Sequence, residues 1–180
     1  SLAGLDAGTY GIAARFAGDA DSLQAIAPGS LTIAKAAASI TLGGLSQTYQ
    51  GGGQVTATTS PGGLPVSLSF TDASGAAVAR PERVGTYGVT ATIADKNYSG
   101  AAVGTLVISP AVLSVSGIGA MNKTYDGSNA ATIDAGHAVL AGVAAGDSVA
   151  IDASHAAASF DGAGVGVNRL VAITGLTLTG

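Results

Sequence analysis

Two histidines and the carboxylates near them are the side chains of this chain that could most readily support catalysis. His137 and His155 are its only histidines, and Asp134, Asp152 and many serines accompany them. A Ser–His–Asp arrangement for acyl transfer can therefore be drawn. No surrounding sequence resembles the sharp turn that presents a nucleophile, and two histidines without cysteine are too few for a zinc site. Both lie in alanine-rich stretches, so we predict partly exposed loop histidines and no catalytic, cofactor-binding or metal-binding residue.

Alternating acidic residues are a second candidate, because calcium is bound by six or more oxygen atoms. Asp19-Ala20-Asp21 and Asp95-Lys96-Asn97 fall in equivalent loops, but Lys96 opposes a cation there. The ten aspartates and Glu82 are dispersed over turns, which argues against the paired carboxylates of a glycoside hydrolase. We predict solvated turn residues at both loops, with calcium binding as the alternative.

Two tyrosines precede turn residues and could stack on a sugar ring. They occur as Tyr49-Gln50-Gly51 and Tyr125-Asp126-Gly127. The same pattern is typical of a turn in which glycine supplies a positive φ, the Asp or Gln bonds the local backbone, and the tyrosine packs on the edge of a domain. We favour the turn. Tyr10 and Tyr87 lie in a strand pattern and are predicted to anchor a core, and Gly51-Gly52-Gly53 does not match a phosphate loop.

The elements that position these residues recur along the chain. Gly8-Thr9-Tyr10-Gly11 returns as Gly85-Thr86-Tyr87-Gly88, and Thr48-Tyr49-Gln50-Gly51 returns as Thr124-Tyr125-Asp126-Gly127. A repeat of roughly 75 residues indicates tandem small domains. We predict the C-terminal part of one repeat at 1–36, a complete domain at 37–110 and an incomplete domain at 111–180. Short joints near 34–38 and 109–112, the second containing Pro110, favour a semi-rigid rod.

The composition excludes several classes of protein. Only 10% of the residues are charged, the net charge is −4, and there are seven Lys and Arg residues. Nucleic-acid binding needs clustered cations, so no nucleic-acid partner is expected. No apolar stretch reaches 18 residues, so no membrane insertion is expected. With no cysteine and an aromatic content of 4%, the core must consist of aliphatic side chains and a few tyrosines.

An alternation of apolar and polar residues predicts half-buried antiparallel strands. In the middle domain we place these strands near residues 38–42, 54–59, 65–70, 76–79, 85–94 and 103–109. Helix evidence is poor along the chain, and only residues 137–145, in the last domain, could form a short helical turn. The fold class is all-β, with tandem small Ig-like β-sandwich domains arranged end to end. A β-grasp-like strand order is the alternative for each domain. A right-handed β-helix is a further alternative for the C-terminal third, although no period of about 20 residues supports it.

Several motifs resemble known families. The middle domain resembles the MBG domain of the YGX type, through Tyr49-Gln50-Gly51, Gly85-Thr86-Tyr87-Gly88-Val89 and Asn97-Tyr98-Ser99-Gly100. The last domain resembles the YDG domain, through Asn122-Lys123-Thr124-Tyr125-Asp126-Gly127, Gly146-Asp147 and Thr174-Gly175-Leu176, and residues 1–35 resemble the end of another MBG unit. Gln50 replaces a common Asp, and Asp21-Ser22-Leu23 stands where Asn97-Tyr98-Ser99 would align. Neither family brings a catalytic or ligand-binding residue to this chain.

The resemblance implies a large bacterial surface or secreted protein of the filamentous-haemagglutinin-like adhesin type. We therefore expect a structural spacer outside a Gram-negative cell, contacting neighbouring repeats of its own chain, without enzymatic activity or cofactor. The alternative is a carbohydrate- or matrix-binding β module that contacts host glycans or proteins. A spacer predicts no exposed aromatic cluster, whereas a lectin-like module predicts several aromatic side chains around one groove.

Overall fold

The structure is a computed structural model that describes residues 4–180. Strands and turns make up this range, without a helix, so the all-β fold class is confirmed. The chain forms two compact units. The first comprises the chain up to Gln47 together with Gly53–Ile108, and the second comprises Thr48–Gly52 together with Ser109–Gly180.

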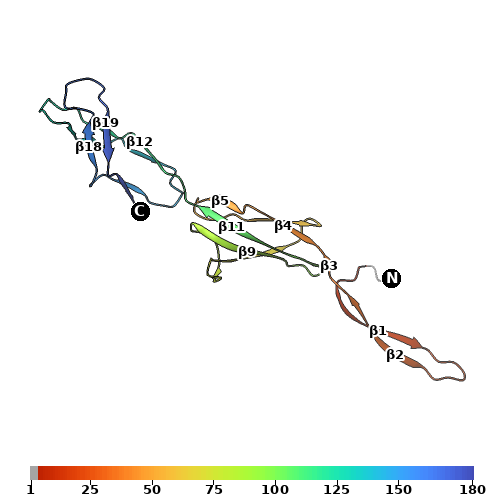
Figure 1. The fold of residues 1–180 in the computed structure, drawn as a ribbon. Helices are drawn as coiled ribbons and strands as arrows, with labels where there is room; N and C mark the ends of the chain where they lie inside the picture. Colours follow the sequence, from red (N-terminus) through yellow and green to blue (C-terminus); the bar gives the residue numbers. More distant parts are fainter. Residues whose placement is uncertain (1–3) are drawn as a thin grey trace. The chain divides into compact units, whose positions relative to one another are not determined.

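A five-stranded antiparallel sheet forms most of the first unit, and Figure 1 shows its long strands β9 and β11 side by side. The order of its strands is β5 (Ser46–Thr48), β11 (Ala101–Ser109), β9 (Gly85–Ile93), β7 (Val66–Thr71) and β8 (Ala77–Val78). Burial alternates strictly along β9 from Tyr87 to Ile93. The period-two pattern in the sequence therefore directs one face of the sheet inward.

Further strands of the first unit form two smaller pairs. β4 (Ser39–Gly43) and β6 (Thr56–Ser60) are antiparallel, and β3 (Ala36–Ala37) runs parallel to β10 (Tyr98–Ser99). A methyl group built on Gly104 of β11 would lie 3.1 Å from the side chains of both Leu42 and Leu45. These leucines therefore lie directly over the large sheet, and a side chain at Gly104 would make them shift.

The core lies on the inner face of β9 and β11. Six apolar side chains are buried there: Tyr87, Val89, Ala91, Ile93, Leu106 and Ile108. Tyr87 is 8% exposed, which confirms its predicted role as a core anchor. Leu106 lies directly opposite it, and Val66 and Leu68 lie opposite Ile93 and Ala91, farther along the same face. The Tyr87 hydroxyl donates a hydrogen bond of 2.9 Å to the carbonyl of Arg83, a bond of the tyrosine-corner kind found in β-sandwiches.

The repeated motif forms a second hairpin with the same geometry. β1 (Gly8–Phe16) pairs with β2 (Ala25–Ile33), and Tyr10 lies opposite Leu31 as Tyr87 lies opposite Leu106. The Tyr10 hydroxyl donates to the carbonyl of Asp6 at 2.7 Å, four residues upstream, as Tyr87 does. Tyr10 is half-buried rather than buried, so the sequence repeat encodes the same local structure in a different environment.

The second unit consists of short antiparallel strands in four small sheets. Their pairs are β12 (Ser114–Ser116) with β16 (Val139–Ala141), β13 (Gly119–Ala120) with β15 (Ile133–Asp134), β17 (Ala150–Asp152) with β20 (Thr177–Thr179), and β18 (Ala157–Phe160) with both β14 (Ala130–Ala131) and β19 (Val171–Thr174). A β-helix pairs its strands in parallel, whereas these pairs are antiparallel. The right-handed β-helix considered for the C-terminal third is therefore wrong. Residues 137–145, where we considered a short helical turn, instead contain the strand β16.

Candidate functional site

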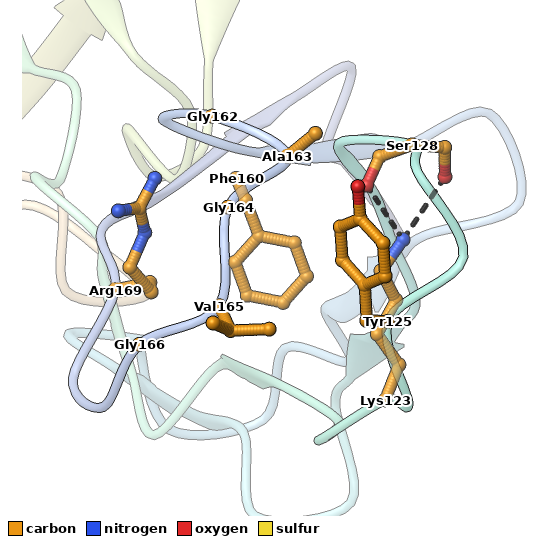
Figure 2. Close-up of a pocket in the computed structure, with 10 residues that line it drawn as sticks. All are labelled: Lys123, Tyr125, Ser128, Phe160, Gly162, Ala163, Gly164, Val165, Gly166 and Arg169. Carbon is orange, nitrogen blue, oxygen red and sulfur yellow. Dashed lines mark hydrogen bonds between the residues drawn. The ribbon is translucent and has the colours of Figure 1, made fainter.

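A hollow that carries polar and aromatic side chains lies in the second unit and has a volume of about 180 Å³. Figure 2 shows its lining: Lys123, Tyr125, Ser128, Phe160, Gly162, Ala163, Gly164, Val165, Gly166 and Arg169. Lys123, Tyr125 and Ser128 lie on the connection from β13 to β14. Phe160 ends β18, and the remaining residues form the loop from β18 to β19. The pocket is therefore built by two loops that the short strands bring together.

Lys123 fixes the first of these loops. Its ammonium group donates to Asp126 Oδ1 at 2.9 Å and to the carbonyl and hydroxyl oxygens of Ser128 at 3.0 Å, and it lies 5.9 Å from the centre of the Phe160 ring. Asp126 also accepts the backbone N–H of Ser128 at 2.9 Å. The hydrogen bond from Lys123, followed by those from Ser128, lowers the pKa of Asp126 from 3.8 to about 2. The Lys123 ammonium thus locks the turn in one conformation.

The structure confirms the turn predicted for Tyr125-Asp126-Gly127. Gly127 has a φ of 80°, and Asp126 bonds the local backbone. The tyrosine differs from expectation, because its side chain is 64% exposed instead of packed on an edge. Tyr49, the repeated counterpart, is half-buried, and its hydroxyl donates to Asp147 Oδ1 at 3.2 Å within the second unit. Only Tyr125 therefore offers an open ring face.

Arg169 organises the second loop of the pocket. Its Nη2 lies 2.8 Å from Asp161 Oδ1, and its buried Nε has no hydrogen-bond partner among the described residues. A methyl group on Gly162 would come within 2.8 Å of Nη2, and one on Gly166 within 2.9 Å of Cδ. The glycines thus let the loop wrap closely around the arginine side chain. Lys123 and Arg169 each pair with one carboxylate, so the pocket has no net charge.

The sequence did not single out Lys123 or Arg169. An i, i+3 pair of opposite charges, Lys123 with Asp126, was the available signal for the first. Arg169 lies eight residues after its partner Asp161, across a stretch with three glycines. Nothing in that spacing predicts how the loop closes.

The two histidines occupy two copies of one turn. Asp134-Ala135-Gly136-His137-Ala138 and Asp152-Ala153-Ser154-His155-Ala156 share their pattern. In each copy the Asp Oδ1 accepts the backbone N–H two residues later, at 3.0 and 2.8 Å, and the next alanine carbonyl accepts a backbone N–H at 3.1 and 3.0 Å. Both imidazoles are exposed, which confirms the prediction of exposed loop histidines.

Of the Ser–His–Asp triad considered from the sequence, the structure brings only the serine and the histidine into contact. Ser154 Oγ lies 2.9 Å from His155 Nδ1, but Asp152 bonds Ser154 and not the imidazole. Those bonds to Ser154 lower the pKa of Asp152. A triad needs the carboxylate on the second ring nitrogen, where it orients the base. The geometry here is therefore that of a turn.

The acidic loops of the first unit use their carboxylates for local bonds. Asp19 Oδ1 accepts the N–H of Asp21 at 3.0 Å, and Asp95 Oδ1 accepts those of Asn97 and Tyr98 at 2.7 and 2.9 Å. Within residues 4–180, no group of three or more histidine, aspartate or glutamate side chains is placed to hold a metal ion. These loops are the turns that the sequence predicted.

The second acidic loop also holds the base of the β1–β2 hairpin within the first unit. Asn97 Nδ2 donates to Asp6 Oδ1 at 2.9 Å, and Asn97 Oδ1 accepts the N–H of Ala7 at 2.7 Å. Lys96 Nζ lies 2.8 Å from Asp6 Oδ2, and Lys35 Nζ donates to the carbonyl of Asp95 at 2.6 Å. The hydrogen bond between Lys96 and Asp6 is the main cause of the lowered pKa of Asp6 and the raised pKa of Lys96.

Comparison with protein families identifies two domains in the chain. Residues 38–112 match the family model of the MBG domain, and residues 109–180 match that of the YDG domain. Comparisons with curated proteins and with solved structures give no match. In residues 4–180 no helix is long and apolar enough to cross a membrane.

Proposed function

This chain carries an MBG domain followed by a YDG domain, and we propose that it is a spacer segment of a large bacterial surface or secreted adhesin. In this role it holds a distal binding domain away from the cell. The proposal places the segment outside a Gram-negative cell, with neighbouring repeats of the same chain as its partners. It assigns the segment no enzymatic activity and no cofactor.

The observation that carries the proposal is the contact between the Asp95–Asn97 loop and the start of the β1–β2 hairpin. A spacer transmits a position only if successive repeats are held together without a slack linker. Here Asn97 bonds both the side chain of Asp6 and the backbone of Ala7, and Lys35 bonds the loop from the other side of the hairpin. Lys35, Lys96 and Asn97 thus connect the hairpin to the loop through directional bonds instead of a flexible linker.

Small-angle scattering tests the spacer. Domains built from strands of about 6–10 residues, at about 3.3 Å per residue and joined without slack, predict a maximum dimension of roughly 60–90 Å. A compact chain of the same length has a radius of gyration near about 16 Å. A compact scattering curve would contradict the proposal. Asn97→Ala should broaden the distance distribution, whereas Asn122→Ala, on an exposed loop outside the contact, serves as the matched control.

A carbohydrate-binding module is the second candidate, and the exposed ring of Tyr125 favours it. Tyr125 lies beside Phe160 in a pocket whose two cations, Lys123 and Arg169, are each paired with a carboxylate, and a wider depression of about 820 Å³ adjoins it and shares Lys123, Phe160 and Arg169. Aromatic faces beside polar groups suit a neutral sugar ring. One open tyrosine is fewer than the several aromatics expected of a lectin-like groove, so the spacer remains the main proposal.

Titration with a panel of neutral oligosaccharides, followed by NMR, separates the two candidates. A binding module predicts saturable shifts at Tyr125 and Phe160 that Tyr125→Ala abolishes. The control Tyr49→Ala changes a tyrosine outside the pocket. A spacer predicts no saturable shift with any member of the panel.

A further inference from the structure

Two segments, one at the start and one at the end of the MBG domain, lie side by side and run in the same direction. We call residues 36–49 the entry segment and residues 97–109 the exit segment. β3 in the entry segment is parallel to β10 in the exit segment. The Ala36 N–H donates to the carbonyl of Asn97 at 2.8 Å, and the Ala38 N–H donates to that of Ser99 at 2.9 Å.

The same arrangement returns at the far end of both segments. β5 adjoins β11 at one edge of the five-stranded sheet. The Val107 N–H donates to the carbonyl of Leu45, and the Tyr49 N–H donates to that of Ser109, both at 2.8 Å. These bonds advance in the same direction along both segments, so β5 runs parallel to β11. The entry and exit segments are therefore bonded to each other at both ends.

Between these two sets of bonds the segments remain in close contact. A methyl group built on Gly100 of the exit segment would overlap the carbonyl oxygen of Ala38. One built on Gly104 would lie 3.1 Å from the side chains of both Leu42 and Leu45 of the entry segment. Glycines thus let the two segments approach each other along their length.

The common direction of the segments decides how the domain responds to a pull. Tension along the chain acts on the entry segment at its start and on the exit segment at its end. Because the segments are parallel, these two points lie at opposite ends of the paired region. The pull slides one segment along the other and loads all the bonds between them together. In the antiparallel β9–β11 hairpin, Gly85 lies opposite Ile108, so a pull at these two residues opens the pairs one after another.

The strands of the YDG domain are connected differently. Among its described strands, the first, β12, pairs with β16, and the last, β20, pairs with β17. Both pairs are antiparallel. Within the described residues 109–180, no strand pair therefore joins the two ends of the domain. The pairing of the entry and exit segments is thus a particular property of the MBG domain and does not follow from an all-β fold.

We propose that the MBG domain has a further function as a load-bearing element, in which the entry and exit segments form a shear clamp against tension along the chain. The proposal rests on the spacer role, because a segment that holds a distal binding domain is pulled when that domain is bound. It goes beyond that role, because a spacer needs only length. The clamp also assigns a role to Asn97-Tyr98-Ser99-Gly100, which forms the start of the exit segment.

Single-molecule pulling in two directions tests the clamp on one folded domain. The chain has no cysteine, so a pair of introduced cysteines sets the two points of attachment. Ala34→Cys with Pro110→Cys pulls along the clamp, and unfolding releases at most about 250–275 Å of chain. Val84→Cys with Pro110→Cys peels β9 from β11 and releases at most about 85–95 Å. We expect a severalfold higher rupture force along the clamp, because the barrier to unfolding governs forced unfolding.

Two proline variants test whether the bonds between the segments carry the load. Proline has no N–H, so Ala36→Pro removes the bond to the carbonyl of Asn97. Ala37→Pro is the matched control, because the N–H groups that donate from β3 belong to its neighbours Ala36 and Ala38. Ala36→Pro should lower the rupture force along the clamp, and Ala37→Pro should lower it much less. Both variants should keep the force that peels β9 from β11, which also shows that the domain is folded.

The outcomes separate the clamp from the spacer. Equal rupture forces in the two directions, or equal losses for the two proline variants, would overturn the clamp. Neither measurement depends on the shape of the chain in solution. A compact scattering curve would therefore contradict the spacer and leave the measured clamp unaffected, whereas equal rupture forces with an extended scattering curve would leave a spacer without a load-bearing domain.

Discussion

The MBG and YDG domains are both built from β-strands, but they are stabilised in different ways. Seven residues are buried within residues 4–180, namely Pro81 and the six apolar residues between Tyr87 and Ile108, and all of them lie in the MBG domain. Among the described residues 109–180 no side chain is buried, and Val165, Val167 and Leu170 are each more than 70% exposed. The MBG domain has strands of nine residues and a five-stranded sheet, whereas the YDG strands are two to four residues long.

Turns bound by aspartate side chains occur in both domains, because Asp72 and Asp95 of the MBG domain each accept the backbone N–H two residues later. Asp126, Asp134 and Asp152 each bond the backbone N–H two residues later. Such bonds satisfy polar groups locally at the surface, whereas burial of a large side chain removes apolar area from water and contributes more. The comparison teaches that the MBG domain combines such turns with a buried core, whereas the described residues of the YDG domain have the turns without buried side chains.

The largest expected difference between the domains comes from truncating one tyrosine in each. Tyr87→Ala should lower the free energy of unfolding by ~3–5 kcal/mol, because it removes a buried ring. Tyr125→Ala should change it by less than about 0.5 kcal/mol, because that ring is 64% exposed. Chemical denaturation of both variants checks the pair. A loss below about 1 kcal/mol for Tyr87→Ala would show that the core does not depend on this ring.

A crowded glycine provides the next largest effect and reveals where the YDG domain is sensitive. Gly117 has a φ of 73°, and a methyl group there would overlap the carbonyl oxygen of His137. Gly117→Ala should therefore cost about 2–3 kcal/mol. Gly127 has a φ of 80° but nothing within 4 Å of its methyl position, so Gly127→Ala should cost only the conformational strain of about 1–2 kcal/mol. Equal losses in thermal or chemical unfolding would contradict the steric argument.

The same contrast explains how far the sequence could be interpreted. In the MBG domain the alternating stretches predicted β4, β6, β7, β8, β9 and β11 to within about two residues, because exposed side chains alternate with less exposed or buried ones along these strands. The three-residue β5 and the two-residue β3 and β10 were missed, since strands that short have no periodicity of their own. In the YDG domain the alternation is too brief to define a pairing.

The candidate pocket was largely beyond prediction for a similar reason. Tyr125 and the turn at Gly127 were visible in the sequence, because turn residues act locally. The approach of Arg169 to Asp161, and of Lys123 to Phe160, depends on how two glycine-rich loops close. Glycine permits many backbone paths, so no spacing of residues determines that closure.

The pH dependence of the YDG domain should sharpen the comparison, because its turns rely on ionised aspartates. The pKa of Asp126 is about 2 in the folded domain against an ordinary 3.8. A lowered folded pKa gives a stabilisation that is fully present above pH 3.8 and is lost as the pH falls toward 2. A ¹³C NMR titration of the Asp126 carboxyl should give a midpoint near 2. Lys123→Met should raise this midpoint toward the ordinary value, and an unchanged midpoint would show that Lys123 does not hold the carboxylate.

We expect the smallest effect on the free energy of unfolding at the two histidines. The same substitutions test whether these histidines contribute to the stability of the YDG turns. His137→Gln and His155→Gln keep a polar side chain at an exposed turn position, and the turn bonds run through the backbone and through Asp134 and Asp152. Each substitution should therefore alter the free energy of unfolding by no more than about 0.5 kcal/mol. Asp152→Ala is the matched comparison, because it removes the bond to Ser154 and should lower the free energy of unfolding by more than either histidine substitution. If His155→Gln proved as costly as Asp152→Ala, the contact between Ser154 and His155 would be a stabilising interaction, and the turn would not be explained by its aspartate alone.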